Sequence, residues 1–388
     1  MALILDGVRL RRRGEIWLDD ISLELSSGMT MLVGPMAAGK TTLMRVVAGL
    51  LPPDAGRVTV NGADVTSVPV RKRSVAFVYQ QFINYPSLSV YENIASPLRL
   101  ARDLSRAGID RRVREVAELM GLGELLDRRP AELSGGQQQR TAIARALARP
   151  VDVLLLDEPL ANLDFKLREQ LRADLRTMFQ GSSSVVLYST ADPTEALTFA
   201  APTVVLGEGR VRHVGEVAEM YARPPTLAVA AALSDPPLNV LPGVVRDGRV
   251  ECLGTSFPAP HAHRPAHSPV QDVTQEAAQD VVLGVRPHHV TIGEGGPGTL
   301  AFPAEIRLAE VTGSATFLHL LLTGRRHLVA QLPGTQLFVP GESTTAFVDP
   351  AHLFVFDENS GRLLAASAAS TASTASTAST AAEVDPHG

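Results

Sequence analysis

The sequence predicts an α/β domain with a mostly parallel, covered sheet, followed by a small all-β domain. The length of 388 residues exceeds one ordinary core, so two domains are expected. Apolar runs typical of strands alternate with helical stretches up to about residue 235, which is the pattern of βαβ units. Beyond that point, short β-rich runs are punctuated by Gly, Pro and Asp up to about residue 365, which favours a small barrel.

The first part of the chain, residues 1–235, supplies the elements of the α/β domain in order. Strands are predicted by the apolar runs at 21–25, 29–33, 58–60, 75–79, 153–156 and 185–188. Helices are predicted at 41–48, within 91–128, at 138–148 and at 165–178.

The second part, residues 236–365, begins at a Pro-Pro pair and is predicted to fold as a small OB-like β domain. Its strands are expected at 243–250, 281–285, 304–311, 316–322, 327–332 and 344–348. Residues 366–388 contain an Ala-Ser-Thr triplet repeat. Such a repeat cannot bury a core, so this tail is expected to be disordered.

Composition narrows the function classes. The net charge is −5 and no long basic run occurs, which argues against a nucleic-acid partner. The single cysteine, Cys252, excludes an intramolecular disulfide or a zinc cluster, and we expect its thiol in or near the core. No segment has the pattern of a signal peptide or the apolar length of a membrane span. Any role at a membrane is therefore expected to depend on docking to other subunits.

Two clusters of basic residues are interpreted as solvated. His261, His263 and His267 lie in a Pro-rich stretch without carboxylates or cysteines, so a loop is favoured over a metal site. The short run Arg71–Arg73 precedes a predicted strand and is interpreted as a solvated edge.

The segment from residue 34 to residue 42 matches the phosphate-loop pattern. It follows a predicted strand and opens a predicted helix, as that pattern requires. Backbone N–H groups and the helix N-terminus would face the phosphates of ATP, Lys40 would neutralise them, and the Thr41 hydroxyl would bind Mg²⁺. The alternative is an ordinary tight strand–helix turn. The candidate ATP-binding residues here are Gly34, Pro35, Met36, Ala37, Ala38, Gly39, Lys40, Thr41 and Thr42.

Two further segments carry polar groups beside helices or strands. The apolar run Val153–Leu156 ends in Asp157 and Glu158. Beside a phosphate loop, Asp157 can hold the Mg²⁺ shell and Glu158 can take a proton from the attacking water. The segment Leu133-Ser134-Gly135-Gly136-Gln137 precedes a predicted helix, so its exposed amides and the helix dipole favour an anion. The alternative for the first segment is an ordinary buried strand that ends in polar residues. The alternative for the second is a simple helix cap.

The order and spacing of these motifs resemble the ABC ATPase family over about the first 235 residues. Five motifs occur in the same order as in that family: the phosphate loop, Gln80, the signature Leu133–Gln137, Asp157-Glu158-Pro159 and Asn162-Leu163-Asp164. The resemblance implies a P-loop NTPase fold with a helical subdomain that dimerises head to tail.

The resemblance also implies a role for each motif. Ser134, Gly136 and Gln137 would serve the ATP of the partner subunit. Gln80 would touch Mg²⁺ and the water and report to the membrane subunit, and Asp164 would join the dimer seam.

The stretch Gln80–Asn93 looks like the membrane-coupling segment of maltose-type importer ATPases. Gly284–Val290 and Val348-Asp349-Pro350 look like the oligomer-binding-type (TOBE) β domain of those subunits. The sequence of Tyr79–Pro86 is similar to that of a glycerol-importer branch, whose transporters contain two different ATPase subunits. These likenesses imply a peripheral subunit at the cytoplasmic face of the inner membrane. They imply transmembrane permease partners, a second ATPase (a heterodimer rather than a homodimer) and, indirectly, a periplasmic solute-binding protein.

Three positions depart from the family pattern. Ala191 stands where a histidine is expected, and its methyl group cannot hydrogen-bond the γ-phosphate. Arg11–Arg13 occupy the place of an aromatic ring that stacks on adenine; Trp17 lies further along, and an arginine plane can stack instead. Met36-Ala37-Ala38 replaces the usual small and Gly-rich middle of the phosphate loop, and we expect Ala37 to be tolerated only with a negative φ.

The sequence therefore predicts the ATP-hydrolysing motor of an ABC importer for a sugar, a polyol such as glycerol, or a similar small solute. Its own site is expected to be degenerate, while its signature completes the partner's site. The alternative is a regulatory subunit that binds nucleotide and hardly hydrolyses it; Ala191 favours this alternative and Glu158 opposes it. A soluble ABC ATPase of repair or translation is opposed by the coupling segment and the β domain.

Overall fold

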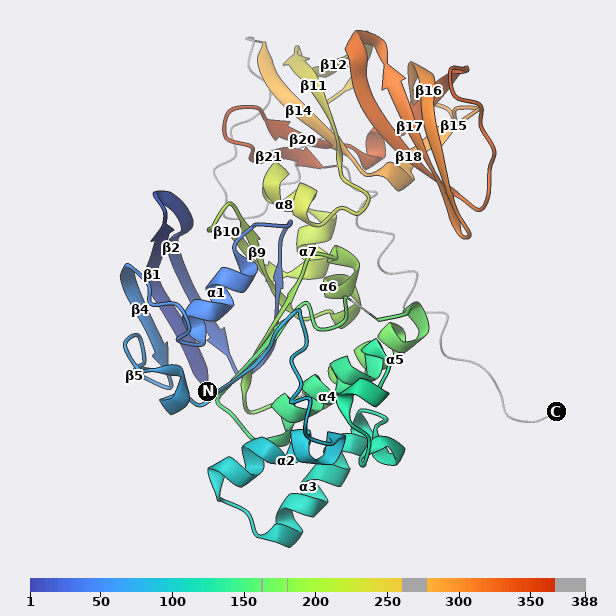
Figure 1. Cartoon of the computed structure of the whole chain (residues 1–388). Coiled ribbons are helices and arrows are strands. Elements are labelled where there is room, and N and C mark those ends of the chain that lie inside the picture. The colour runs from blue at the N-terminus through green and yellow to red at the C-terminus, as the bar shows by residue number, and fades with distance from the viewer. Residues whose placement is uncertain (162, 180, 260–277, 367–388) are drawn as a thin grey trace, which may run out of the picture. The chain divides into compact units, whose positions relative to one another are not determined.

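The computed structural model describes residues 1–161, 163–179, 181–259 and 278–366 (Figure 1). The chain forms two compact units that divide between Val217 and Ala218. Three features named above lie outside the described residues: the Pro-rich stretch with His261, His263 and His267, Asn162, and the triplet-repeat tail. No helix in the described ranges is long and apolar enough to cross a bilayer.

A six-stranded, mostly parallel sheet forms the centre of the first unit, as predicted. Its strand order is β10-β9-β3-β8-β7-β6, and only the β9–β10 pair is antiparallel. Every residue of β7 and β8 is buried, which is typical of strands covered on both faces. The strands are β3 (Gly28–Val33), β6 (Val75–Val78), β7 (Val153–Asp157), β8 (Val185–Thr190), β9 (Pro202–Gly207) and β10 (Arg210–Glu216).

The first unit also contains an antiparallel sheet with the order β2-β1-β4-β5, which was not predicted as a separate sheet. The strands expected at 21–25 and 58–60 belong to this sheet rather than to the parallel one. The strands are β1 (Ala2–Arg12), β2 (Glu15–Ser26), β4 (Ala55–Val60) and β5 (Ala63–Asp64). Strand β1 buries Leu3, Leu5, Val8 and Leu10 on one face. The bulges between β1 and β2 interrupt the strict period of two, which explains why the pattern was difficult to see.

The helices of the first unit follow the predicted order. The helices α2, α3 and α4 pack against one another, and in Figure 1 they lie away from the antiparallel sheet. Their bounds are α1 (Lys40–Val47), α2 (Val90–Ala101), α3 (Arg106–Leu119), α4 (Gly135–Ala148), α5 (Phe165–Phe179) and α6 (Pro193–Phe199). Short 3₁₀ turns occur at Val70–Lys72, Gly123–Leu125 and Pro130–Glu132.

One hydrophobic core joins α1 to both sheets of the first unit. Leu43, Met44 and Val47 of α1 are buried with Leu32 of β3 and Leu155 of β7. This packing holds the first turn of α1 at the carboxyl end of β3, where the phosphate-loop residues lie.

The second unit is β-rich and carries two antiparallel sheets around one shared core, in agreement with the predicted barrel-like domain. One sheet has the order β13-β12-β11-β14-β20-β21 and the other β15-β19-β16-β17-β18. The first sheet contains β11 (Asn239–Arg246), β12 (Arg249–Cys252), β13 (Thr255–Pro258), β14 (Gln279–Val285), β20 (Phe354–Asp357) and β21 (Leu363–Ala366). The second contains β15 (Val290–Ile292), β16 (Leu300–Thr312), β17 (Ala315–Leu322), β18 (Arg326–Pro333) and β19 (Ser343–Val348).

The remaining elements of the second unit are short. Helix α7 (Val217–Ala222) begins at the division between the units, and α8 (Leu227–Ala232) follows it. Single 3₁₀ turns occur at Pro287–His289, Thr323–Arg325 and Pro350–His352.

The prediction of a single strand at residues 243–250 is wrong, because this stretch forms a hairpin. Asp247 and Gly248 adopt φ values of 50° and 70°, so the chain reverses between β11 and β12. The expected position of Cys252 is confirmed: its side chain is buried, and burial raises the pKa of its thiol to about 11.

Candidate functional site

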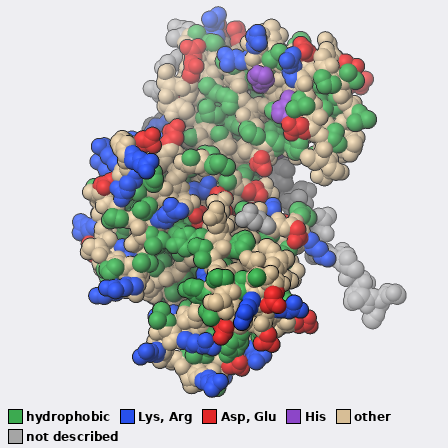
Figure 2. All heavy atoms as spheres, viewed as in Figure 1, with side chains coloured by type: hydrophobic (Ala, Val, Ile, Leu, Met, Phe, Trp, Pro, Cys, Tyr) green, Lys and Arg blue, Asp and Glu red, His purple; other side chains and the backbone are tan. Residues whose placement is uncertain are grey.

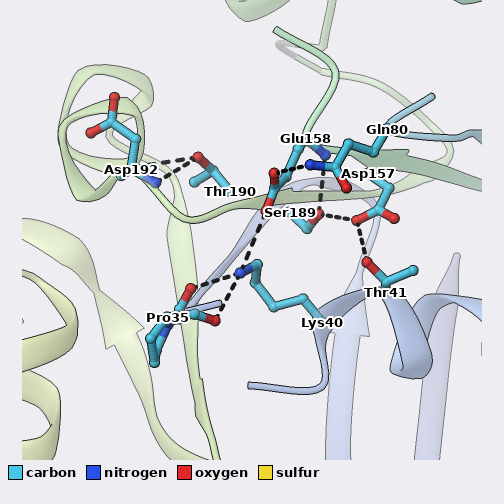
Figure 3. A network of polar contacts seen from close by, with 10 residues as sticks. Pro35, Lys40, Thr41, Gln80, Asp157, Glu158, Ser189, Thr190 and Asp192 are labelled. Carbon is cyan, nitrogen blue, oxygen red and sulfur yellow. Dashed lines mark hydrogen bonds and ion pairs between the residues drawn. The ribbon is translucent and has the colours of Figure 1, made fainter. Parts of the chain in front are cut away.

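The candidate site lies at the carboxyl ends of four strands of the six-stranded sheet. Gly34 follows β3, Gln80 lies just beyond β6, Asp157 ends β7, and Ser189 and Thr190 end β8. Because neighbouring strands here are parallel, their carboxyl ends meet at one edge, where α/β sheets place their ligands. Figure 3 shows the resulting network of side chains.

The phosphate loop connects β3 to α1 through two left-handed residues. Gly39 has φ 102° and Ala37 has φ 64°. The expectation of a negative φ at Ala37 is therefore wrong. A left-handed alanine costs about 1–2 kcal/mol, because its Cβ crowds the following carbonyl group. The tight curl of the loop, in which the Ala38 N–H donates to the Pro35 carbonyl at 3.1 Å, imposes this conformation.

Lys40 begins α1 and is 5% exposed. Its ammonium donates to the carbonyl oxygens of Gly34 at 2.7 Å and Pro35 at 3.1 Å and lies 3.6 Å from a Glu158 carboxylate oxygen. Burial lowers the pKa of Lys40, and the neighbouring Glu158 partly offsets this effect. The site thus holds a desolvated cation beside the N-terminus of a helix, which together favour phosphate.

Asp157 is 2% exposed and receives hydrogen bonds from two hydroxyl groups. Thr41 Oγ1 donates to Asp157 Oδ1 at 3.1 Å, and Ser189 Oγ donates to the same oxygen at 2.7 Å. Hydroxyl and carboxylate oxygens are ligands that Mg²⁺ prefers. The pair Thr41–Asp157 therefore fits a magnesium ion next to a phosphate group.

Glu158 follows Asp157 and carries the second carboxylate of the network. It has φ 46°, an uncommon value for a residue with a side chain, and its N–H is within hydrogen-bond distance of both Ser189 O (3.1 Å) and Ser189 Oγ (3.2 Å). Its side chain accepts a hydrogen bond from Gln80 Nε2 at 2.8 Å. A carboxylate placed beside an amide and a lysine can accept a proton from a water molecule.

Ala191 lies immediately after β8, and its side chain is exposed. On one side of it Thr190 Oγ1 accepts from the Asp192 N–H at 3.0 Å, and Asp192 caps α6 by accepting from the Thr194 N–H at 2.8 Å. The backbone of this turn is therefore well held. The methyl group of Ala191 itself offers neither a donor nor an acceptor to the site.

The predicted signature begins α4 with a capping box. Ser134 Oγ accepts from the Gln137 N–H at 3.3 Å, and Gln137 Oε1 accepts from the Ser134 N–H at 2.9 Å. Gly136 faces Leu163 and Leu167, and an added Cβ would lie within 3.3 Å of both side chains. In the part of the chain that the structure describes, the polar side-chain contacts of Ser134 and Gln137 stay within α4, so these residues do not join the Lys40 network.

Comparisons with known proteins agree with this geometry. A family model described as ABC transporter matches residues 18–161, and one described as TOBE domain matches residues 283–356. The chain is 36% identical over 362 residues to the sn-glycerol-3-phosphate import ATP-binding protein UgpC of Paracoccus denitrificans, covering 93% of this chain and 98% of the relative. The chain belongs to the ABC transporter ATP-binding proteins. It is also 36% identical over 344 residues to the sulfoquinovosyl glycerol transport ATP-binding protein SmoE of Agrobacterium fabrum, covering 88% and 93%.

A solved structure extends the likeness to three dimensions. The dimeric post-hydrolysis structure of the ATP-binding cassette MJ0796 bound to ADP and Pi matches with a TM-score of 0.50 and 27% identity. The match covers 55% of this chain and 98% of that one. The resemblance to ABC ATPases is therefore confirmed, as are the ATPase class and the TOBE-type second domain.

In this ABC transporter subunit, the segment that follows Gln80 is attached to α4. Asn84 Nδ2 donates to the Gln138 carbonyl at 2.8 Å, and Arg145 donates to the Ile83 carbonyl at 2.5 Å. The Arg145 guanidinium also lies 4.8 Å from the centre of the Tyr85 ring. The segment thus contacts the helix that carries the signature, while Gln80 contacts Glu158.

The arginine run near the start of the chain lies at the turn between β1 and β2. Arg12 donates to the Pro52 carbonyl at 3.0 Å and pairs with Asp54 at 3.3 Å, whereas Arg13 and Trp17 are exposed. On the face shown in Figure 2, Lys and Arg side chains gather over the antiparallel sheet with acidic side chains among them. Strand β2, which follows this turn, is tied to the phosphate loop through Gly209, which donates to the Ala38 carbonyl at 3.0 Å and accepts from the Asp19 N–H at 2.8 Å.

Two contacts of the site and its surroundings could not be predicted from the sequence. The sequence offered Ser189 or Thr190 as a residue that positions the water if Ala191 is tolerated; the structure shows that Ser189, at the polar end of β8, contacts both carboxylate residues instead. The solvated-edge interpretation is wrong for Arg73, whose guanidinium donates to the carbonyls of Val47 (2.7 Å), Thr66 (3.0 Å) and Val68 (2.8 Å). Arg73 thereby satisfies the C-terminal end of α1, a contact that no local pattern reveals.

Proposed function

We propose that this chain is the ATP-hydrolysing motor subunit of an importer for a small polar solute. The observation that carries the proposal is the meeting of Lys40, Thr41, Gln80, Asp157 and Glu158 at one edge of the parallel sheet (Figure 3). A buried cation, a hydroxyl–carboxylate pair and a second carboxylate are the groups that phosphoryl transfer from Mg²⁺-ATP to water requires.

Each residue takes one role in this proposal. Lys40 and the N–H groups of the phosphate loop bind the β- and γ-phosphates, with Thr42 following in the first turn of α1. Thr41 and Asp157 would hold Mg²⁺, and Gln80, just beyond the neighbouring strand β6, would offer a further oxygen to the metal or its water. Glu158 accepts the proton of the attacking water. Bound Mg²⁺ would supply charge neutralisation on the transferring phosphate.

The remaining motif requires a second subunit. Ser134–Gln137 begin α4 with N–H groups and a helix dipole directed outward, and they bond within their own helix rather than to the Lys40 network. In our proposal this helix start binds the ATP held by the phosphate loop of a partner ATPase, in a head-to-tail dimer. The exposed segment from Ile83 to Tyr85 is proposed to receive transmembrane permease subunits at the cytoplasmic face of the inner membrane.

The solute class is proposed from the relatives. The two relatives named above are an import protein for sn-glycerol-3-phosphate and a transport protein for sulfoquinovosyl glycerol. Both solutes contain a glycerol unit, which favours a sugar, a polyol such as glycerol, or a glycerol derivative as the cargo. A periplasmic binding protein and the permease would select it, because the motor does not contact the solute.

We further propose that the dimer is asymmetric, because Ala191 offers no polar group to the site built on Lys40. A partner ATPase with a complete site would then carry most of the turnover. The test is the ATPase rate of the complete transporter in membranes, with Glu158→Gln made singly and compared with the matching change in the partner. A catalytic base in use contributes about 10²–10⁴-fold in rate. Glu158→Gln is therefore expected to reduce the rate much less than the partner's change.

The opposite result is expected at the signature. Replacing Ser134 by a bulky residue should block the partner's site and stop turnover. Equal, full inhibition by both glutamine variants would contradict the asymmetry and leave a symmetric motor.

A second candidate function is a regulatory subunit that binds ATP and hardly hydrolyses it. Ala191 favours this alternative, whereas the contacts of Glu158 with Gln80 and Lys40 favour the motor. A Glu158→Gln transporter with an unchanged rate would select the regulatory alternative.

A further inference from the structure

Ser189 connects the two acidic residues of the site. In the parallel pairing of β7 with β8, Ser189 is the register partner of Asp157. Side chains at paired positions of neighbouring strands point to the same face of a sheet. The register therefore places the Ser189 hydroxyl directly beside the Asp157 carboxylate (Figure 3).

Both hydrogen-bonding functions of the Ser189 hydroxyl are used within the protein. It donates to Asp157 Oδ1 at 2.7 Å and accepts from the Glu158 N–H at 3.2 Å. The Ser189 residue is 0% exposed and its single O–H donor is used by Asp157, which leaves no donor for the γ-phosphate or the attacking water. Any effect of Ser189 on hydrolysis must act through Asp157 and Glu158.

The contact with Asp157 sets the orientation of a buried carboxylate. Thr41 and Ser189 both donate to Oδ1, which directs the carboxylate plane and turns Oδ2 away from β8. A hydrogen-bond donor behind a metal-binding carboxylate orients that ligand and commonly changes metal affinity or activity about 10- to 100-fold when it is removed. With an apolar residue at this position, Asp157 would keep, among the residues that the structure describes, the Thr41 hydroxyl as its one side-chain donor.

The contact with Glu158 supports an unusual backbone conformation. Glu158 has φ 46°, a conformation that is uncommon for a residue with a Cβ and costs free energy. Its N–H approaches both the carbonyl and the hydroxyl oxygen of Ser189, at 3.1 and 3.2 Å. These two acceptors hold the residue whose carboxylate contacts Gln80 and Lys40.

The end of β8 is itself well anchored on the opposite face. Tyr188 is 0% exposed and donates from its hydroxyl to Glu195 of α6 at 3.3 Å, while Arg172 of α5 lies 4.0 Å from the other Glu195 oxygen. Burial raises the pKa of Glu195. Ser189 therefore extends from a fixed strand end, which suits a residue that positions others.

We propose that Ser189 is a positioning residue for ATP hydrolysis: its hydroxyl orients the Asp157 carboxylate that holds Mg²⁺ and fixes the left-handed backbone of Glu158. This inference rests on the proposed role of Asp157 as a magnesium ligand. It assigns a function to a serine near the end of a buried strand, at a site where Ala191 supplies no polar contact.

The test measures the Mg²⁺ dependence of ATP binding to the purified full-length chain by calorimetry. Ser189→Ala is expected to raise the half-saturating Mg²⁺ concentration about 10- to 100-fold, with the affinity for ATP in EDTA unchanged. Ser189→Thr retains the hydroxyl and is expected to restore the Mg²⁺ dependence. The matched control is Thr203→Val on β9, which removes another fully buried hydroxyl that donates to the Ala201 carbonyl at 2.9 Å. This control is expected to leave the Mg²⁺ dependence unchanged.

Three results would overturn the inference. The first is an unchanged Mg²⁺ titration for Ser189→Ala, and the second is a shift for Thr203→Val as large as that for Ser189→Ala. The third is a loss of ATP affinity for Ser189→Ala that is as large in EDTA as with Mg²⁺, which would indicate a purely structural role. If Ser189→Ala does not fold, Ser189→Cys keeps the volume with a weaker donor and should give an intermediate shift. An unchanged titration of Ser189→Cys would equally contradict us.

The variant Asp157→Asn distinguishes a failure of the proposed magnesium site from a failure of the proposed role of Ser189. If Asp157→Asn leaves the Mg²⁺ dependence unchanged, the proposed magnesium site is wrong. If Asp157→Asn shifts it and Ser189→Ala does not, only the role of Ser189 is wrong.

Discussion

Replacing Lys40 by methionine tests the nucleotide site with little effect on the fold. The change removes the ammonium and keeps an unbranched side chain in the same buried space. A hydrogen bond to a charged group contributes about 1.5–3 kcal/mol, which corresponds to a roughly 10- to 150-fold loss of ATP affinity. The ammonium must give up its bonds to Gly34 and Pro35 (2.7 and 3.1 Å) to reach a phosphate, so the lower part of that range is expected.

The stability of the ATP-free protein should change far less. Burial lowers the pKa of Lys40, so removing its charge relieves a desolvation cost while two carbonyl groups lose a donor. These effects oppose each other, and we expect the unfolding free energy to change by about 1 kcal/mol or less.

Calorimetry of the purified chain with ATP gives the affinity, and thermal unfolding without ATP gives the stability. Lys72→Met, an exposed lysine of the same unit, is the matched control and should bind ATP normally. An affinity of Lys40→Met within about threefold of the unmodified chain, less than 1 kcal/mol, would refute the nucleotide site.

Three further predictions concern packing, pH and the tail. Gly34→Ala should destabilise the first unit by about 1–3 kcal/mol in chemical unfolding, because a Cβ there would lie 2.2 Å from the Leu206 carbonyl oxygen; Gly313→Ala, where a Cβ meets no atom within 4 Å, is the neutral control. Burial lowers the pKa of His289 from 6.5 to about 3, so the unfolded chain binds its proton more readily. Stability from this residue should be complete above pH 6.5 and decline as the pH falls toward 3, and His289→Asn should reduce that slope in acid unfolding; an unchanged slope would contradict the assignment. Deleting Ala369–Gly388 should leave folding and transport intact, since a triplet repeat adds no core; a large loss of transport would reveal a docking role.

Much of the site could be predicted because its motifs are local. A phosphate loop is recognisable from glycines and a lysine at fixed spacing, and the strand before it and the helix after it are predicted by their apolar periodicity. Asp157 and Glu158 were found in the same way, at the end of an apolar strand. The second domain was recognised by the change in texture after residue 235, although the hairpin at Asp247 and Gly248 was read as one strand.

The remaining features depend on contacts between residues distant in sequence. Ala37 is left-handed because the curl between β3 and α1 leaves it no other conformation, and its own residue type predicts the opposite. Its position in a short run of basic residues predicts that Arg73 is solvated. In the fold, however, the C-terminus of α1 lies beside it and supplies carbonyl groups to its guanidinium.

The sequence by itself determined the phosphate loop, the acidic strand end, the signature and their order, because each is encoded within a few consecutive residues. Only the tertiary structure decided that Ser189 supports Asp157 and that Gln80 contacts Glu158. The physical reason is the register of parallel strands. It brings together the carboxyl ends of β6, β7 and β8, whose separation along the chain is set by helices rather than by any local pattern.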